Sequence, residues 1–394
     1  MEYMSVKQAA EKWDVSIRRV QAYIKEGRID GVVRFGGHAW MIPAVSMKPA
    51  DPRLPQSRNR RRTLPDTFDR LIEESILPMP ENDPDSILDI VSENKLRLHF
   101  VSELAYLRGD FEKVISCFQT IKDDDAALIR NGPVAIAAAV STGDYELYEE
   151  IETYLKEIIK EDISPGLTVF AELSLNTAYV SALAPGMVTD WLKNGDFGAV
   201  PQKVRLDAVY KRAKYFQCLS RYGEMLTTAQ TGLTFCQHEK GITYNKIYMP
   251  IACALALSAM GRADEAEKYL MQALNICMPH GFITPFAESA TAFGGLLEKC
   301  LERNFPGSHD AVTQQWRRTF GGWISFHNHF TKNNITSILS LRNYEIATMA
   351  VHGVPYSEIA KRFNITVGRL NNIMGEIYRE LLISGKKELS QYIL

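Results

Sequence analysis

The apolar residues of the first thirty positions recur at helical spacing in two short runs. Ser5 and Gln8 stand three residues apart in the manner of a capping box, which predicts a helix over residues 6–13. Ser16 is placed to cap a second helix, and Gly27 is placed to end it. One face of the second helix carries the apolar residues that we expect to be buried: Ile17, Val20 and Ile24. The pattern predicts two short, crossed helices.

The opposite face of the second helix is basic and polar. Its outward-facing residues are Arg18, Arg19, Gln21 and Lys25. Residues 32–35 and 39–42 then follow the pattern of two short strands, which are joined through a pair of glycines. Arg34 and His38 lie in this hairpin. Two crossed helices followed by a hairpin form a winged helix-turn-helix, which the pattern therefore predicts for residues 1–43.

From about residue 95 to 330 the pattern is helical and rich in small residues. The segments AYLRGDFEKVISCF and AAVSTGDYELYEEI align on Gly109 and Gly143, which are 34 residues apart. This spacing is the period of tetratricopeptide repeats, and the segment around Gly261 repeats the theme. Each helix pair of such a repeat must stack on the next pair to bury its apolar side. We therefore expect an α-solenoid of helix pairs over residues 95–334.

An aromatic face marks the helix that is predicted near the end of this array. Its residues are Trp316, Phe320, Trp323 and Phe330. We interpret the face as closing the end of the solenoid, because a ligand site would need convergent polar groups that the pattern does not show. His327 and His329 stand two positions apart on the same predicted helix and so face different ways, which argues against a metal pair.

The last sixty residues predict three helices and a short fourth one. Ser340 is placed to cap the first helix, which Gly353 stops, and residues 356–363 form the second. Thr366 caps the third helix, over residues 367–382. Its buried stripe is expected to be Leu370, Ile373, Ile377 and Leu381, and its polar surface to be Arg369, Asn371 and Asn372. The final segment, KKELSQYIL, is expected to place Leu389 and Ile393 on one face.

The N-terminal segment resembles the recognition segment of the MerR and excisionase-like winged helix family. The residues that carry the likeness are Ser16, Arg18, Val20, Tyr23, Gly27 and Ile29. It covers about forty residues. The long dimerising helix and the cysteine metal site of full MerR proteins have no counterpart in this sequence. The resemblance implies a recognition helix that enters the major groove of DNA, with a wing that touches the backbone.

The C-terminal segment resembles the LuxR-type helix-turn-helix, with spacing kept and no gap. The matching residues are Leu339, Arg342, Glu345, Ile346, Gly353, Glu358, Ile359, Ala360, Arg362, Ile365, Thr366, Asn372, Ile377 and Leu381. Arg369, Leu370 and Asn371 stand where the family usually has T-V-K, so asparagine replaces the lysine that meets DNA. The final segment resembles the short helix through which such domains pair. Residues 276–288 also resemble a stretch of the helical-repeat arrays in MalT-like regulators.

The net charge of −2 hides an asymmetry along the chain. Residues 1–63 hold 13 Lys/Arg and 6 Asp/Glu, a balance of +7, and the rest of the chain therefore carries −9. Residues 337–394 hold only +2. Residues 44–94 are read as a basic, proline-rich linker and lead-in, in which Arg60, Arg61 and Arg62 form one basic run. A basic end on an acidic body indicates an anionic partner at the N-terminal end.

The sequence contains no catalytic constellation. It lacks a phosphate-binding G-x-x-x-x-G-K-[ST] loop, a G-x-S-x-G or H-E-x-x-H motif and any CxxC pair. The six cysteines fall inside apolar helical patterns and are expected to be reduced core residues. No run of 18 apolar residues is present, and charges stand where a signal peptide needs an apolar core. We expect no enzyme, no cofactor, no metal and no membrane partner.

Together these patterns predict a mostly all-α chain of four parts: residues 1–43, 44–94, 95–334 and 335–394. The expected function is that of a cytoplasmic bacterial transcription regulator, a homodimer that binds double-stranded DNA through its terminal domains. Its helical-repeat body would sense an effector, either a small molecule or a protein. The residues expected to meet DNA are Ser16, Arg18, Arg19, Gln21, Lys25, Arg34, His38, Thr366, Arg369, Asn371 and Asn372.

Two alternatives remain open at this point. In the first, only the N-terminal domain binds DNA, and the C-terminal domain pairs protomers or holds a partner. In the second, the chain is a repeat scaffold whose helix-turn-helix units bind only protein. Affinity for random duplex DNA, with a steep salt dependence, separates both regulator hypotheses from the scaffold.

Overall fold

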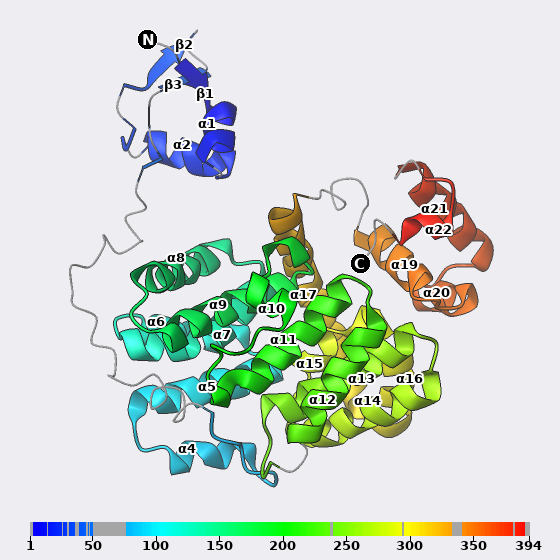
Figure 1. Ribbon diagram of the computed structural model, residues 1–394. Coiled ribbons are helices and arrows are strands. Elements are labelled where there is room, and N and C mark those ends of the chain that lie inside the picture. Colours follow the sequence, from blue (N-terminus) through cyan, green and yellow to red (C-terminus); the bar gives the residue numbers. More distant parts are fainter. Residues whose placement is uncertain are drawn as a thin grey trace. The chain divides into compact units, whose positions relative to one another are not determined.

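The chain forms two compact units, residues 1–62 and 63–394, and each is described by itself. The computed structural model describes residues 3–49 and 76–390 (Figure 1). Within these ranges, the residues left undescribed are 14, 26, 30, 36–38, 45, 47, 237–238, 294, 333–340 and 381–382. The described part is mostly helical, as the sequence predicts.

The first unit combines two helices with a small antiparallel sheet. Its elements are β1 (Tyr3–Ser5), α1 (Val6–Trp13), α2 (Ile17–Lys25), β2 (Val33–Phe35) and β3 (Ala39–Pro43). The strand order is β1-β3-β2, so the central strand β3 pairs with both of the others. The predicted hairpin is confirmed to within one residue at each strand. The strand β1 was not expected, because three residues are too few to show a period-two pattern.

Capping side chains set the starts of both helices in this unit. The Ser5 backbone amide donates to Gln8 Oε1 at 2.8 Å, and the Gln8 amide donates to Ser5 Oγ at 3.2 Å. This reciprocal pair is the predicted capping box. The Arg19 amide donates to Ser16 Oγ at 3.2 Å, and Gly27 adopts a left-handed φ of +66° just beyond the helix end. The predicted boundaries are therefore confirmed.

The buried face of α2 differs from the predicted one at its first residue. Val20 is fully buried and Ile24 partly so, but Ile17 is 47% exposed, and the expectation that it is buried is wrong. Tyr23 is buried instead, three residues after Val20. The reason is that Ile17 opens the helix, one turn before the stripe that meets Trp13, Met4 and Ile42 in the small core.

The second unit is built from helices. Before residue 237 they are α4 (Ile87–Ile90), α5 (Asn94–Arg108), α6 (Phe111–Ile121), α7 (Asp125–Thr142), α8 (Tyr145–Glu161), α9 (Pro165–Ser181), α10 (Asp190–Asn194), α11 (Arg205–Cys218) and α12 (Tyr222–Cys236). After it come α13 (Tyr244–Ala259), α14 (Ala263–Cys277), α15 (Thr284–Ala287), α16 (Leu296–Asn304) and α17 (Pro306–Thr331). Short 3-10 turns lie among them: η1 (Pro84–Ser86), η2 (Pro185–Met187), η3 (Gln202–Val204), η4 (Met278–His280) and η5 (Ala290–Phe293). The described residues of this unit hold no strand, only an isolated bridge between Met79 and Ile242.

Left-handed glycines separate successive helices at the three positions that the repeat pattern marks. Gly109, Gly143 and Gly261 have φ values of +81°, +74° and +76°. Gly109 and Gly143 directly follow α5 and α7, and Gly261 lies in the turn after α13; in each case the next helix begins two residues later. Glycine is favoured at such a position because a Cβ atom would strain a left-handed backbone. Neighbouring helices then pack in succession, with α5 on α6, α7 on α8 and α13 on α14 (Figure 1).

The long helix α17 packs on the other helices of this unit with one side and exposes the opposite side. It contacts α7, α15 and α16. Trp316 and Phe320 join one apolar cluster, whereas Phe326 is fully buried in another, where its ring stacks on Tyr145 at 4.3 Å between centroids. The predicted aromatic face is confirmed, because the buried residues of α17 follow a single helical stripe, and Arg317, Arg318 and Gly321 are exposed on the opposite side. That this helix closes the end of a solenoid stays a prediction.

A close approach between two helices fixes the position of α17. A Cβ atom on Gly322 would lie 2.6 Å from the Val140 carbonyl oxygen and 2.7 Å from the Gly143 amide nitrogen. Only glycine therefore fits where α17 crosses the end of α7. The neighbouring Gly321 is exposed, and a Cβ atom there would meet nothing within 4 Å.

Four helices close the described chain: α19 (Leu341–Val351), α20 (Tyr356–Arg362), α21 (Val367–Glu380) and α22 (Lys386–Leu389). Leu370, Ile373 and Ile377 of α21 are buried, as predicted, whereas Leu381 and the expected cap Ser340 lie outside the described residues. The Arg369 amide donates to Thr366 Oγ1 at 3.1 Å, which confirms that cap.

Leu389 does not form a pairing face. Its side chain is fully buried, and α22 packs on α19 within the same chain. The expectation that Leu389 presents an exposed dimer surface is wrong, because the short helix folds back and uses this leucine in its own core. Ile393, its expected neighbour on that face, lies outside the described residues.

The glycine pair of α17 gives a prediction about stability. Gly322→Ala should lower the free energy of unfolding by roughly 1–3 kcal/mol, because the added methyl group meets the α7 backbone. Gly321→Ala should instead raise it by roughly 0.5–1 kcal/mol, because alanine is the better residue in an exposed helix interior. Urea unfolding followed by circular dichroism measures both. Equal effects of the two substitutions would contradict the packing of α17 on α7.

Candidate functional site

The basic face of α2 is the first candidate site. Arg18, Gln21 and Lys25 are exposed on it, and Ser16, the cap, is exposed at its start. Arg19 is half-buried: its Nε donates to the Tyr23 hydroxyl at 3.3 Å, and its guanidinium carbon lies 5.5 Å from the centre of that ring. Arg19 therefore also stabilises the helix, whereas Arg18 extends from it.

The predicted wing is described only in part. Arg34 lies on β2 and faces Trp40 of β3 in the antiparallel register. His38 lies outside the described residues. Tyr23, beneath the basic face, also has the guanidinium of Arg28 4.9 Å from its ring centre, so that two arginines flank one buried tyrosine.

The polar start of α21 is the second candidate site. The structure brings all four predicted residues to the surface there: Thr366, Arg369, Asn371 and Asn372. Thr366 also caps the helix through its hydroxyl oxygen. The exposed Val367 stands between the cap and Arg369. The charge of this face comes from a single arginine, Arg369.

Ion pairs hold the C-terminal helices against the rest of the second unit. Arg362, the last residue of α20, pairs through Nη1 with Glu298 of α16, and its guanidinium carbon lies 5.4 Å from the Trp316 ring centre. The Lys299 Nζ lies 3.6 Å from Glu358 Oε1, at a more exposed place. Arg362 is thus engaged by the body, whereas the neighbouring Lys361 and the polar start of α21 are exposed.

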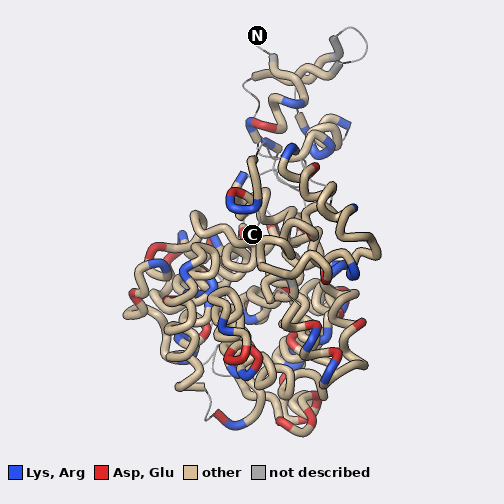
Figure 2. The backbone as a smooth tube through the Cα atoms, turned by 90° about the vertical axis from the view of Figure 1, so that its right-hand side faces the viewer, with Lys and Arg blue, Asp and Glu red and all other residues tan. Residues whose placement is uncertain are grey.

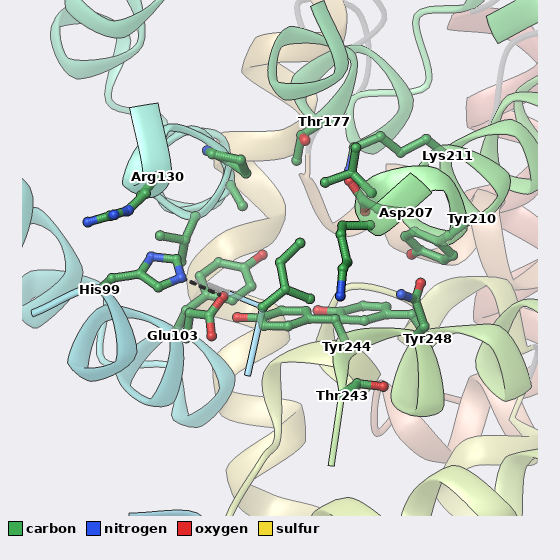
Figure 3. Close-up of a pocket in the computed structure, with 18 of the residues that line it drawn as sticks. His99, Glu103, Arg130, Thr177, Asp207, Tyr210, Lys211, Thr243, Tyr244 and Tyr248 are labelled. Atoms are coloured by element: carbon green, nitrogen blue, oxygen red, sulfur yellow. Dashed lines mark hydrogen bonds and ion pairs between the residues drawn. The ribbon is translucent and has the colours of Figure 1, made fainter. Parts of the chain in front are cut away.

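A cavity of about 220 Å³ lies among the helices of the second unit (Figure 3). Helices α5, α7, α9, α11 and α13 line it, together with residues 76–79. Met79 is held there by two backbone hydrogen bonds with Ile242, at 2.9 and 2.7 Å. The segment that follows the undescribed residues 50–75 therefore forms part of the cavity wall.

Tyrosines and carboxylates supply much of the polar lining. The hydroxyls of Tyr106 and Tyr248 both donate to the carboxylate of Glu288, the second at 3.4 Å. Burial raises the pKa of Glu288 above its ordinary value. The Tyr244 hydroxyl is buried in the cavity wall and has no hydrogen-bond partner among the described residues.

Two polar contacts within single helices also line the cavity, as do the basic residues Arg130 and Lys203. The Lys211 Nζ lies 2.6 Å from Asp207 Oδ2, both on α11, and the Lys211 side chain is only 7% exposed. On α5, His99 Nε2 lies 3.3 Å from Glu103 Oε1, as the dashed line in Figure 3 marks. Within each pair the partners are four residues apart on one helix, so each pair is fixed by local spacing.

Sequence reasoning missed this cavity. The i,i+4 spacing of Tyr244 and Tyr248 was visible, but nothing in the pattern connects α13 with Glu288 or with Tyr106, 182 residues before it. Such a site depends on the packing of distant helices. The predicted DNA-contacting residues, in contrast, lie in two short local segments and could be found from cap and turn signals alone.

Comparison with known protein families, with curated proteins and with solved structures finds no match for this chain. Within the part of the chain that the structure describes, no helix is long and apolar enough to cross a membrane.

The two histidines that stand two positions apart on α17, His327 and His329, contact different partners. His327 Nδ1 lies 2.9 Å from the Ala182 carbonyl oxygen, and the ring of His329 packs on Tyr145.

The contact between α20 and α16 gives a second prediction. A double-mutant cycle with Arg362→Met and Glu298→Gln should give a coupling energy of about 1 kcal/mol or more, because both side chains are more than three-quarters buried. The measurement is the free energy of unfolding of the four proteins in urea.

The matched control is the neighbouring pair of Lys299 and Glu358, whose side chains are 67% and 44% exposed. Their coupling in an equivalent cycle should stay below about 0.5 kcal/mol, because water screens exposed charges. A larger coupling for this exposed pair than for the Arg362 pair would show that the C-terminal helices are not held as described.

Proposed function

We propose that the protein is a cytoplasmic DNA-binding transcription regulator, in which the N-terminal unit is the main DNA reader. The observation that carries this proposal is the exposed basic face of α2 in a basic segment of balance +7. Two short helices with an antiparallel hairpin match the architecture of a winged helix-turn-helix. The MerR-like and excisionase-like resemblance of the same residues supports this assignment.

The chemistry of α2 suits a major groove. An exposed arginine can donate two hydrogen bonds to guanine or pair with a phosphate, and Arg18 is the most accessible candidate. Gln21 and Lys25 follow it three and seven positions later, on the same side of the helix. Arg19 adds positive charge to this surface, and its Nε also donates a hydrogen bond to the Tyr23 hydroxyl.

The C-terminal helices fit a secondary role. Their LuxR-like turn is supported by the Thr366 cap and by Asn364, whose φ is +52°. Asn371 and Asn372 can bond an adenine edge but bring no charge to a phosphate. The pairing of Arg362 with Glu298 places one basic residue of this segment on the body. This favours either a junior role for the C-terminal domain in DNA binding or the alternative in which only the N-terminal domain binds DNA and the C-terminal one pairs protomers or holds a partner.

The helical body supports the sensing part of the proposal. Its stacked helix pairs follow the glycine spacing of tetratricopeptide repeats, and acidic and basic residues are mixed over its surface (Figure 2). In this view, the described residues of the body form no broad positive patch for DNA. We propose that the body forms an α-solenoid that receives the effector, and that two copies of the chain act together on DNA.

Replacement of Arg18 tests the N-terminal site. In the full-length protein, Arg18→Ala should weaken binding to duplex DNA by about tenfold, because an exposed contact to a base or a phosphate is lost. If the contact is to phosphate, the slope of log affinity against log salt should shrink by about 0.9. Fluorescence anisotropy with a labelled random duplex, and then with a duplex identified by mapping bound genomic DNA, measures both.

The control for this experiment is Lys7→Ala, which removes the same charge from an exposed position on α1. It should leave both affinity and slope nearly unchanged. If Arg18→Ala and Lys7→Ala behave alike, α2 is not the reading helix. If the full-length protein does not bind any duplex even at low salt, the scaffold alternative replaces the regulator.

A second pair of variants ranks the two ends of the chain. Arg369→Ala should reduce the affinity for DNA less than Arg18→Ala does, because the C-terminal segment offers a balance of only +2 against +7. Arg379→Ala, at an exposed position near the end of the same helix, is the matched control. A larger loss for Arg369→Ala than for Arg18→Ala would make the C-terminal helices the main reader.

A further inference from the structure

The charged side chains around the cavity in the helical unit are matched within the protein. Three acids and three bases line it: Glu103, Asp207, Glu288, Arg130, Lys203 and Lys211. Asp207 pairs with Lys211 at 2.6 Å, and Glu103 lies 3.3 Å from His99. Glu288 accepts hydrogen bonds from two tyrosine hydroxyls, and Arg130 and Lys203 have interactions of their own within the protein. Burying a charged ligand here would cost its hydration without offering it an unmatched counter-charge among these lining residues.

The tyrosine rings give the cavity a flat side. Tyr244 and Tyr248 stand one turn apart on α13, and their rings are parallel to within 2° with centroids 5.9 Å apart. Figure 3 shows the two rings side by side along one side of the cavity, with an ammonium group of the protein beside them. A positive charge near these rings is therefore supplied by the protein itself, and the rings act as a flat, mostly apolar surface.

The Tyr244 hydroxyl differs from these matched groups. It is buried in the cavity wall, and in the part of the chain that the structure describes it has no hydrogen-bond partner. Burial and then the negative charges of Glu103, Glu288 and Asp207 raise the pKa of this phenol, so the hydroxyl keeps its proton and can donate it to a hydrogen bond. A buried donor without an acceptor is costly, and an oxygen atom of a ligand would remove that cost.

Apolar side chains supply a further part of the wall. Pro133, Val134 and Ala137 of α7 and Phe170 of α9 line the cavity, together with Met79. An apolar group placed against them leaves water, which favours binding. The cavity volume of about 220 Å³ is below the roughly 300–1,000 Å³ typical of sites for drug-sized ligands, so the ligand must be small.

We propose that this cavity binds a small, uncharged organic molecule that has a planar apolar ring and a carbonyl oxygen. The oxygen accepts a hydrogen bond from the Tyr244 hydroxyl, and the ring lies against the apolar side chains of α7 and α9. Each part of this description follows from one observation. The matched charges of the lining exclude a net charge on the ligand, the Tyr244 donor requires an acceptor, and the volume limits the size.

The inference rests on the proposed function only where it makes this molecule the effector of the regulator. Residues 76–79 belong to both the cavity wall and the chain that leads from the N-terminal unit. Ligand contact with this segment would connect the cavity with the DNA-binding end. Binding of the molecule itself needs no DNA, so it can be tested alone and can succeed or fail independently of DNA binding.

The test is isothermal titration calorimetry of the full-length protein with four probes of similar shape: acetophenone, ethylbenzene, benzylamine and benzoate. Acetophenone should bind about fivefold more tightly than ethylbenzene, which lacks the oxygen, because one hydrogen bond is gained. It should bind at least about tenfold more tightly than the charged benzylamine and benzoate, because their charges would lose hydration. Preference for either charged probe, equal affinity for ethylbenzene or no binding of acetophenone would overturn the proposal.

A variant of Tyr244 places the probe in the cavity. Tyr244→Phe removes the hydroxyl and keeps the ring, so it should weaken acetophenone by about fivefold and leave ethylbenzene unchanged. The matched control is Tyr154→Phe on α8, away from the cavity lining, where the hydroxyl donates to Asp125 Oδ1 at 3.0 Å. This control should change the affinity of neither probe. Full acetophenone affinity in the Tyr244→Phe protein overturns the proposal.

The melting temperature shows whether the Tyr244 hydroxyl is free to meet a ligand. Tyr244→Phe should leave the melting temperature unchanged or raise it, because no hydrogen bond to a described residue is lost. Tyr106→Phe should lower it, because the carboxylate of Glu288 loses a donor. If Tyr244→Phe lowers the melting temperature as much as Tyr106→Phe does, the hydroxyl is already paired within the protein and the proposal is overturned.

Discussion

The contact of Gly322 with the end of α7 is the constraint on which the helical unit depends. Because no side chain separates the two backbones, α17 can pack closely on α7 and place Trp316 and Phe320 in one apolar cluster and Phe326 in another. Apolar burial is the main stabilising term in folding, so a helix that joins two cores makes them mutually dependent. The same helix also meets the C-terminal helices, where the rings of Phe320 and Tyr344 lie 5.6 Å apart.

The two ends of the chain use charge differently. In the N-terminal unit, Arg18 extends from a helix whose core is formed by Val20 and Tyr23. Near the C-terminus, Arg362 is used to hold α20 on α16. A partly buried guanidinium that already pairs with Glu298 and lies over Trp316 is not available to a phosphate. This difference gives the proposed division of labour between the ends a physical basis beyond their net charges.

In the cavity, hydrogen bonds bring buried polar groups from distant parts of the chain together. Tyr106, Tyr248 and Glu288 come from three separate segments and share hydrogen bonds inside the helical unit. A carboxylate held in such surroundings loses the solvation of water, and its hydrogen bonds with tyrosines recover only part of that loss.

The sequence by itself determined the local structure of this protein. The Ser5–Gln8 capping box, the Thr366 cap and the left-handed glycines at 109, 143 and 261 were readable because each depends on residues within a few positions of one another. The tertiary structure alone decided which faces those helices bury. Ile17 became exposed, Leu389 became buried, and α17 packed on α7, because each outcome depends on partners far away in the chain. The cavity is the same case: Tyr106 and Glu288 meet only once the helices between them have packed.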